Sequence, residues 1–171
     1  MTGKTKITLI SSVLLISFLF LSCFKSEKFP DQPIISNAQA EVMGDSALIS
    51  FDFTDGDADL GLSPSDTFGV FAPDSFYYNN IYLDYFEKDD ELGWVNGVNF
   101  SGDPVHFGYR IKPIPVSEKT EGIKGRIDVF VVPQYRNKLS PESDTVKFEI
   151  TLIDRALNVS NKIETPALIA N

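Results

Sequence analysis

The apolar residues of this chain alternate with polar residues from Ile34 onward, and turn-forming residues recur at short intervals. A period of two is typical of β-strands that bury one face, and no window has the 3.6-residue period of an amphipathic helix. The alternation is clearest at residues 145–153, where Val146, Phe148, Ile150 and Leu152 are expected to face the core. The pattern therefore predicts an all-β chain built as an antiparallel sandwich.

Seven or eight segments have this strand pattern. They cover residues 34–42, 47–53, 80–87, 94–95, 105–114, 125–132, 145–153 and 161–169. The segment Asn80–Glu87 is aromatic and β-branched enough to bury both faces. No linker and no internal repeat separates the segments, so residues 34–171 are expected to form one domain.

The N-terminus has the features of an export signal. Lys4 and Lys6 precede an apolar stretch, Ile7–Leu21, that is too short to span a membrane comfortably. It ends in Phe20-Leu21-Ser22-Cys23, which resembles the lipobox of bacterial lipoproteins. The resemblance implies that residues 1–22 are removed, that Cys23 is lipidated, and that residues 23–33 tether the domain to a membrane. The alternative is an uncleaved anchor with an incidental buried cysteine. The lipobox interpretation is favoured because the only cysteine of the chain lies at the required position.

Composition excludes several classes of function. The chain has 24 acidic against 15 basic residues and a net charge of −9, which disfavours nucleic acid as a partner. Its single cysteine excludes an internal disulfide, and a lone histidine, His106, offers no zinc site. No Gly-x-Ser-x-Gly elbow and no other catalytic constellation is found. We therefore expect a protein without enzymatic activity.

One stretch is a candidate metal site. Residues 52–61 hold four aspartates, and Asp55, Asp57 and Asp59 occupy alternate positions. Calcium takes six to eight oxygen ligands, which a loop curled around the ion can provide from carboxylates and carbonyls. In the register of an EF-hand loop, Gly61 supplies a carbonyl, Ser63 a hydroxyl or water, and Asp66 a carboxylate. Two features depart from that motif, because Leu60 replaces the turn glycine and strands flank the loop.

Two motifs resemble a known family. Residues 148–160, FEITLIDRALNVS, are similar to the final hairpin of bacterial immunoglobulin-like domains. Together with residues 49–61, ISFDFTDGDADLG, they resemble small lipoproteins of the Bacteroidota. The resemblance implies an immunoglobulin-like sandwich in the cell envelope, anchored to the outer membrane, and it implies no activity.

In such a sandwich, the loops that follow residues 47–53 and 145–153 emerge at the same end. Asp154 and Asn158 are then expected near Asp55–Asp59, where they can complete a calcium shell. Without a cation, the carboxylates repel one another by about 1 kcal/mol per close pair in water. The alternative is a loop of Asx turns, in which each aspartate accepts hydrogen bonds from nearby backbone amides.

Three functions remain open. The first is a non-enzymatic binding or structural module that presents its loops to a protein or glycan partner. The second is an accessory subunit of an outer-membrane assembly, and the third is a hydrolase that uses the acidic loop. Trp94 and the tyrosines at 77, 78, 82 and 85 are candidates for a sugar platform, although packing within the sandwich is the favoured interpretation of these aromatics.

Overall fold

The computed structural model describes residues 28–116, 121–131 and 144–169. The predicted signal peptide and Cys23 lie outside this range. Within it, no helix is long and apolar enough to cross a membrane.

The described residues form nine β-strands and two short 3-10 helices. The strands are β1 (Ile34–Met43), β2 (Ser46–Asp55), β3 (Ile81–Asp89), β4 (Gly93–Asn96), β5 (His106–Tyr109), β6 (Ile123–Val131), β7 (Thr145–Leu152), β8 (Ile163–Glu164) and β9 (Leu168–Ile169). The 3-10 helices are η1 (Gly69–Phe71) and η2 (Phe76–Tyr78), both between β2 and β3. The predicted all-β fold is confirmed.

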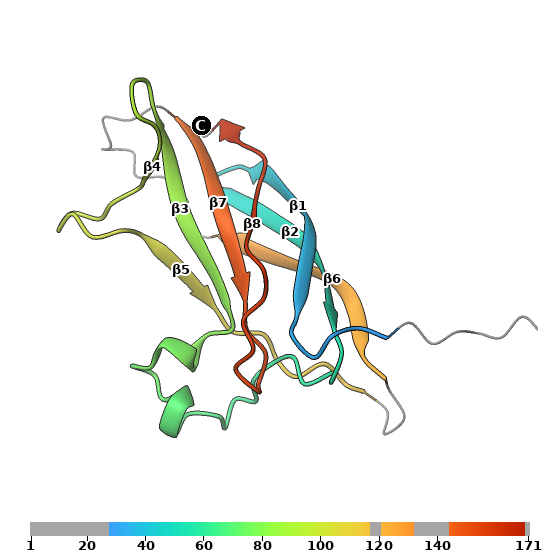
Figure 1. The fold of residues 1–171 in the computed structure, drawn as a ribbon. Helices are drawn as coiled ribbons and strands as arrows, with labels where there is room; N and C mark the ends of the chain where they lie inside the picture. Colours follow the sequence, from blue (N-terminus) through green and yellow to red (C-terminus); the bar gives the residue numbers. More distant parts are fainter. Residues whose placement is uncertain (1–27, 117–120, 132–143, 170–171) are drawn as a thin grey trace, which may run out of the picture.

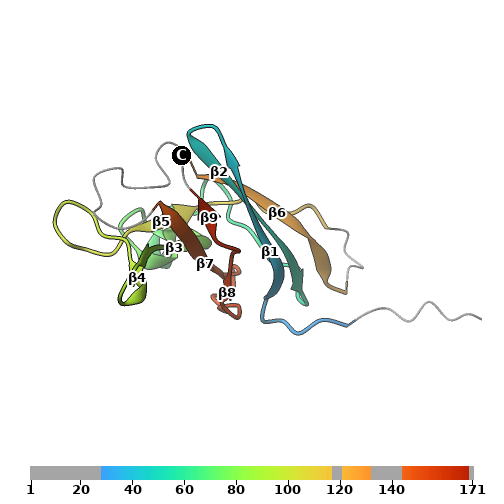
Figure 2. The same ribbon diagram turned by 90° about the horizontal axis from the view of Figure 1, so that it is seen from above.

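The strands form two antiparallel sheets. Sheet A has the order β1-β2-β6, and sheet B has the order β4-β3-β7-β8, with β5 also paired to β3 and β9 to β7. Figure 1 shows η1 and η2 beyond the strands at one end of the molecule, and Figure 2 shows sheet A on one side and sheet B on the other. This is the arrangement of an immunoglobulin-like sandwich.

The core lies between the sheets and follows the alternation in the sequence. Phe51 of β2 and Phe148 of β7 are fully buried, together with their apolar neighbours two residues away on each strand. Burial of a Leu, Ile or Phe side chain contributes about 1.5–3 kcal/mol, so these two central strands hold much of the folding free energy.

Three strand predictions need correction. The segment 80–87 buries only one face, because Tyr82, Asp84 and Phe86 remain half-exposed on the outer side of β3. The predicted strand at 105–114 stops at Tyr109, before Pro113 and Pro115. The last strand is split into β8 and β9 around Pro166, because proline lacks the N–H that a sheet ladder needs.

The outer face of β7 is also less exposed than expected. Lys147 is only 8% exposed, because its ammonium group lies 4.8 Å from the centre of the Trp94 ring and 2.6 Å from Glu164 Oε1. Its aliphatic stem is covered while its charge is satisfied. The outer face of sheet B is thus partly covered by its own side chains.

Candidate metal centre

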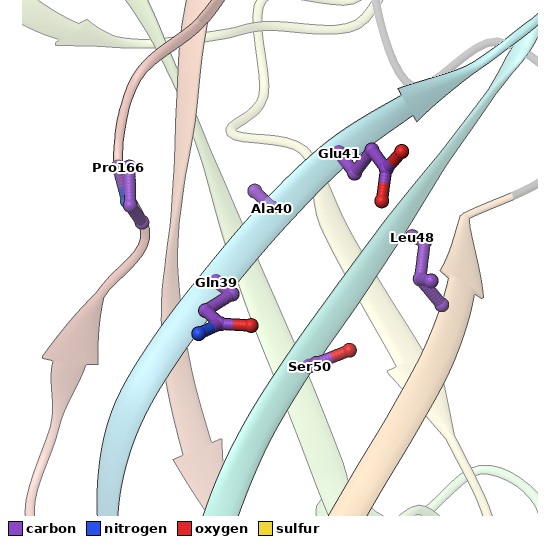
Figure 3. A pocket seen from close by; sticks show the side chains of 6 residues that line it. All are labelled: Gln39, Ala40, Glu41, Leu48, Ser50 and Pro166. Carbon is purple, nitrogen blue, oxygen red and sulfur yellow. The ribbon is translucent and has the colours of Figure 1, made fainter.

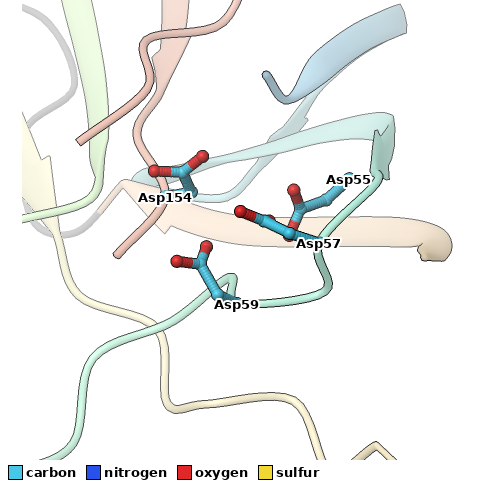
Figure 4. Close-up of side chains that lie close together, drawn as sticks. All are labelled: Asp55, Asp57, Asp59 and Asp154. Atoms are coloured by element: carbon cyan, nitrogen blue, oxygen red, sulfur yellow. The ribbon is translucent and has the colours of Figure 1, made fainter. Parts of the chain in front are cut away.

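Two loops meet at the end of the sandwich from which η1 and η2 extend. One follows β2 in sheet A and the other follows β7 in sheet B. They bring together four carboxylates, whose nearest oxygens all lie within 4.8 Å of one another; these are Asp55, Asp57, Asp59 and Asp154. Figure 4 shows the four side chains converging on one region. We call this group the acidic cluster. The expected meeting of the two loops is found.

Asp55 is the innermost member. It is the last residue of β2, is paired with Ile123 of β6, and is fully buried. Its Oδ2 accepts a hydrogen bond from the backbone N–H of Leu60 at 3.1 Å. Its Oδ1 is buried and has no hydrogen-bond partner. A buried carboxylate oxygen without a donor is costly, so the site is incomplete as an arrangement of protein groups alone.

The loop after Asp55 is forced to curl. The backbone N–H of Gly56 donates to the Pro30 carbonyl at 2.8 Å, and a Cβ at this glycine would lie only 2.4 Å from the Phe29 carbonyl oxygen. Ala58 then adopts a left-handed conformation with φ of 60°, which is uncommon for a residue other than glycine. The turn brings Asp57 and Asp59 back toward Asp55.

Asp154 is held rigidly from the other sheet. It lies two residues beyond Leu152, the last residue of β7, and is 1% exposed. Its Oδ1 accepts the backbone N–H of Asn158 at 2.7 Å, and its Oδ2 accepts the Asn158 Nδ2 at 2.8 Å. Leu157 completes this tight loop with φ of 71°. Asn158 therefore orients the carboxylate of Asp154.

The cluster is electrostatically strained. Burial, followed by the charge of Asp57, raises the pKa of Asp55 from 3.8 to about 7. Burial also raises the pKa of Asp59 and of Asp154, and Asp57 adds to both shifts. Each shift means that the charged form is disfavoured without a counter-charge. At neutral pH the cluster needs either a proton or a cation.

The donor set selects the kind of cation. All four side chains offer carboxylate oxygens, which suit hard ions such as calcium, whereas zinc favours nitrogen and sulfur ligands. Buried Asp55 and Asp154 can lie at the back of such a site, while exposed Asp57 leaves room for water as a further ligand.

One predicted ligand, Asp66, is not in the cluster. The carboxylate of Asp66 is paired with the Arg155 guanidinium, at 3.0 Å from Nη2, and accepts the Ser63 N–H at 2.7 Å. Gly61 has φ of 109° and packs against the backbone of Lys112, so backbone conformation and packing alone already require a glycine there. The EF-hand register fails here because the chain after Leu60 turns away to pair its backbone with residues 111–114.

Sequence reasoning missed Arg155. Its side chain binds Asp66, and its backbone N–H donates to Asp59 Oδ1 at 3.3 Å. It thereby links the β7 loop to the β2 loop without placing its charge among the four carboxylates. Its position directly after Asp154 was the only signal in the sequence, and it did not reveal the pairing across 89 residues.

No protein-family model, curated protein or solved structure matches this chain.

Proposed function

We propose that this protein is a lipid-anchored module of the cell envelope, without enzymatic activity, whose acidic cluster binds calcium. The ion joins the end of β2 in sheet A to the end of β7 in sheet B and fixes the loops at that end. The fixed loops and the adjoining sheet faces serve for binding a partner.

One observation carries the metal proposal. The cluster has four carboxylates within 4.8 Å, and one of them, Asp55, has a buried oxygen that no protein group satisfies. Hydrogen bonds from nearby backbone amides account for Asp66 and for Asp154, whose oxygens accept the N–H groups of Ser63 and Asn158. They do not account for Asp55 Oδ1. A proton shared between Asp55 and Asp57 is the competing explanation, and a calcium titration separates the two.

The test is a calorimetric titration of calcium into the full chain, purified in detergent and stripped with EDTA at pH 7.5. We expect one site per chain. The Asp57→Asn variant removes one ligand at an exposed position and is expected to lose most of the affinity. Asp45→Asn, in the exposed β1–β2 turn, is the matched control and is expected to bind as the parent does. Equal binding by the two variants would rule out the cluster as the site.

The anchor proposal rests on Lys4, Lys6, the apolar stretch and Cys23. A single acyl chain binds a membrane with an association constant of only about 10⁴ M⁻¹, so stable attachment needs more than one chain. The full-length chain, expressed in bacteria grown with a labelled fatty acid, is expected to carry the label. The Cys23→Ser chain, which keeps the apolar stretch, should remain unlabelled. Equal labelling of both chains, or of neither, would contradict lipidation at Cys23.

A second candidate function is that of an accessory subunit of an outer-membrane assembly. Exposed apolar side chains favour it. Phe68 is 82% exposed and Val70 of η1 is 49% exposed, at the same end as the acidic cluster. Exposed apolar side chains that lie together are typical of contact surfaces. This alternative predicts that a stoichiometric partner co-purifies with the anchored chain and is lost from Phe68→Ser.

A further inference from the structure

A second site lies on the outer face of sheet B. A pocket of about 450 Å³ opens there, within the range of small-molecule sites. Its lining comes from η2, from β3 and β5, and from the segment between β7 and β8. One wall is apolar and the other is charged; the lining residues that matter are Phe76, Tyr82 and Val159 on the first and Asp84, His106 and Lys162 on the second.

The apolar wall is a fixed aromatic platform. The rings of Phe76 and Tyr82 are stacked, with centroids 4.8 Å apart and an interplanar angle of 3°. The Tyr82 hydroxyl donates to the backbone carbonyl of Phe76, which ties η2 to β3. Phe76 nevertheless remains 61% exposed. An aromatic ring that is rigidly held but left in water offers apolar area to a ligand at little further entropic cost.

The charged side chains of the second wall are paired with one another. The His106 imidazole donates from Nδ1 to Asp84 Oδ1 at 2.6 Å, and Lys162 Nζ lies 3.7 Å from Asp84 Oδ2. Lys162 Nζ also donates to Glu149 Oε1 at 2.6 Å. Each charge already faces an opposite or polar partner, yet the side chains of His106 and Lys162 are each 55% exposed and keep hydrogen-bonding capacity toward solvent. This wall offers both donors and acceptors and no unpaired charge.

We propose that this pocket binds a neutral saccharide, with the sugar ring against Phe76 and its hydroxyls hydrogen-bonded to the charged wall. A pyranose has an apolar C–H face, which suits the negative face of an aromatic ring. Its hydroxyls both donate and accept, so they match carboxylate acceptors beside ammonium and imidazole donors. An anionic ligand would face Asp84 and Glu149, and a purely apolar ligand would bury the polar wall without satisfying it.

The other pocket of similar size does not have this chemistry. It has a volume of about 390 Å³ and lies against β1, β2 and Pro166, as Figure 3 shows. Its lining has one charged side chain, Glu41, and no aromatic ring. Of these two pockets, only the sheet B pocket has both an exposed aromatic ring and a wall of paired charged side chains.

The proposal rests on the function proposed above as a binding module and names its ligand class. The probe is an array of neutral, cationic and anionic oligosaccharides, screened with the full chain in detergent at pH 7.5. The neutral oligosaccharide retained most strongly is then titrated by calorimetry. We expect Phe76→Ala to weaken its binding about tenfold or more, since the apolar contact is lost. Asp84→Asn is expected to weaken binding about tenfold through loss of a charge-assisted hydrogen bond.

Phe100→Ala is the matched control. Phe100 is 92% exposed in the loop between β4 and β5 and does not line the pocket, so its removal is expected to leave binding unchanged. The proposal is overturned if the array retains no neutral saccharide, if acidic or basic saccharides are retained best, or if Phe76→Ala binds as the Phe100→Ala control does. Binding should persist in Asp57→Asn and in Cys23→Ser. Loss of the calcium site or of the anchor would therefore leave this test informative.

Discussion

Two groups of carboxylates in this sandwich differ in whether a basic side chain lies beside them. In the acidic cluster, four carboxylates converge and burial raises the pKa of Asp55, Asp59 and Asp154. On the outer face of sheet B, Asp84 and Glu149 each lie beside Lys162, and the hydrogen bond to Glu149 raises the pKa of that lysine. The sheet B carboxylates share a lysine of the protein as their counter-charge, whereas no basic side chain lies among the four carboxylates of the cluster.

The difference is not caused by a lack of basic residues near the cluster. Arg155 directly follows Asp154, but its guanidinium is turned to Asp66 and lowers the pKa of that carboxyl. The guanidinium of Arg155 is thus close to the cluster but is paired with Asp66, which is not a member of it. This comparison teaches that a basic residue next to a cluster in sequence need not neutralise it, and that a buried carboxylate oxygen without a partner is the better reason to test for a metal.

The largest expected effect is a pH dependence that only the cluster shows. The pKa of Asp55 is 3.8 in the unfolded chain and about 7 in the fold, so between these values the folded state holds a proton that the unfolded state has lost. The free energy of unfolding of the EDTA-treated protein should therefore fall as pH rises from 4 to 7, by an amount on the order of a few kcal/mol. Urea unfolding at a series of pH values measures this. Stability that instead rises steadily over that range would contradict the shift.

Calcium is expected to produce the next largest effect. At a hundredfold excess over its dissociation constant, a ligand that binds only the folded state adds about 2.7 kcal/mol. For a domain of this size, that corresponds to a rise in melting temperature of about 5–11 °C. Calcium should also remove the fall in stability toward pH 7, because it binds the deprotonated carboxylates. Identical melting curves in calcium and in EDTA at pH 7.5 would refute the site.

The effect of Asp57→Asn on the free energy of unfolding is expected to have opposite signs without and with calcium. In EDTA at pH 8 the variant should be more stable than the parent by about 1 kcal/mol, because one repulsive carboxylate is gone. In saturating calcium it should be less stable, because a ligand is lost. Paired melting curves in the two buffers measure both effects. A variant that is destabilised equally in both would have only a structural role.

The smallest effect is expected on sheet B. Asp84→Asn weakens the pairs with His106 and Lys162, and exposed ion pairs contribute about 0–1 kcal/mol. The loss should be the same in calcium and in EDTA, because Asp84 is not part of the cluster. A calcium-dependent loss would show that the two charge groups are coupled, and the contrast drawn above would then fail.

The strands could be predicted because burial in a sandwich follows a period of two. Ala47, Ile49 and Phe51 alternate in the sequence and are all fully buried in β2. The prediction failed where tertiary contacts decide exposure. Lys147 is covered because Trp94 and Glu164 happen to lie over it, and neither is near in sequence.

The cluster itself could be predicted in part. The alternate spacing of Asp55, Asp57 and Asp59 and the sandwich topology were enough to expect Asp154 beside them. The role of Asp66 could not be predicted, since its partner Arg155 is distant along the chain and the loop register depends on which backbone groups pair after Leu60. The aromatic platform could be predicted only in part, since Tyr82 was among the candidate sugar-binding aromatics but its stacking with Phe76 depends on how η2 folds back onto β3.

The hydrogen bond from Gly56 to Pro30 has a mechanical consequence. Only five residues lie between Cys23 and Phe29, so a lipid at that cysteine would hold the domain by a short tether attached beside the aspartates. A force transmitted along this tether would then act on the loop after β2 before it acted on either sheet. Calcium bound in that loop would make the attachment point more rigid. Without the ion, the domain would change its orientation relative to the bilayer more freely.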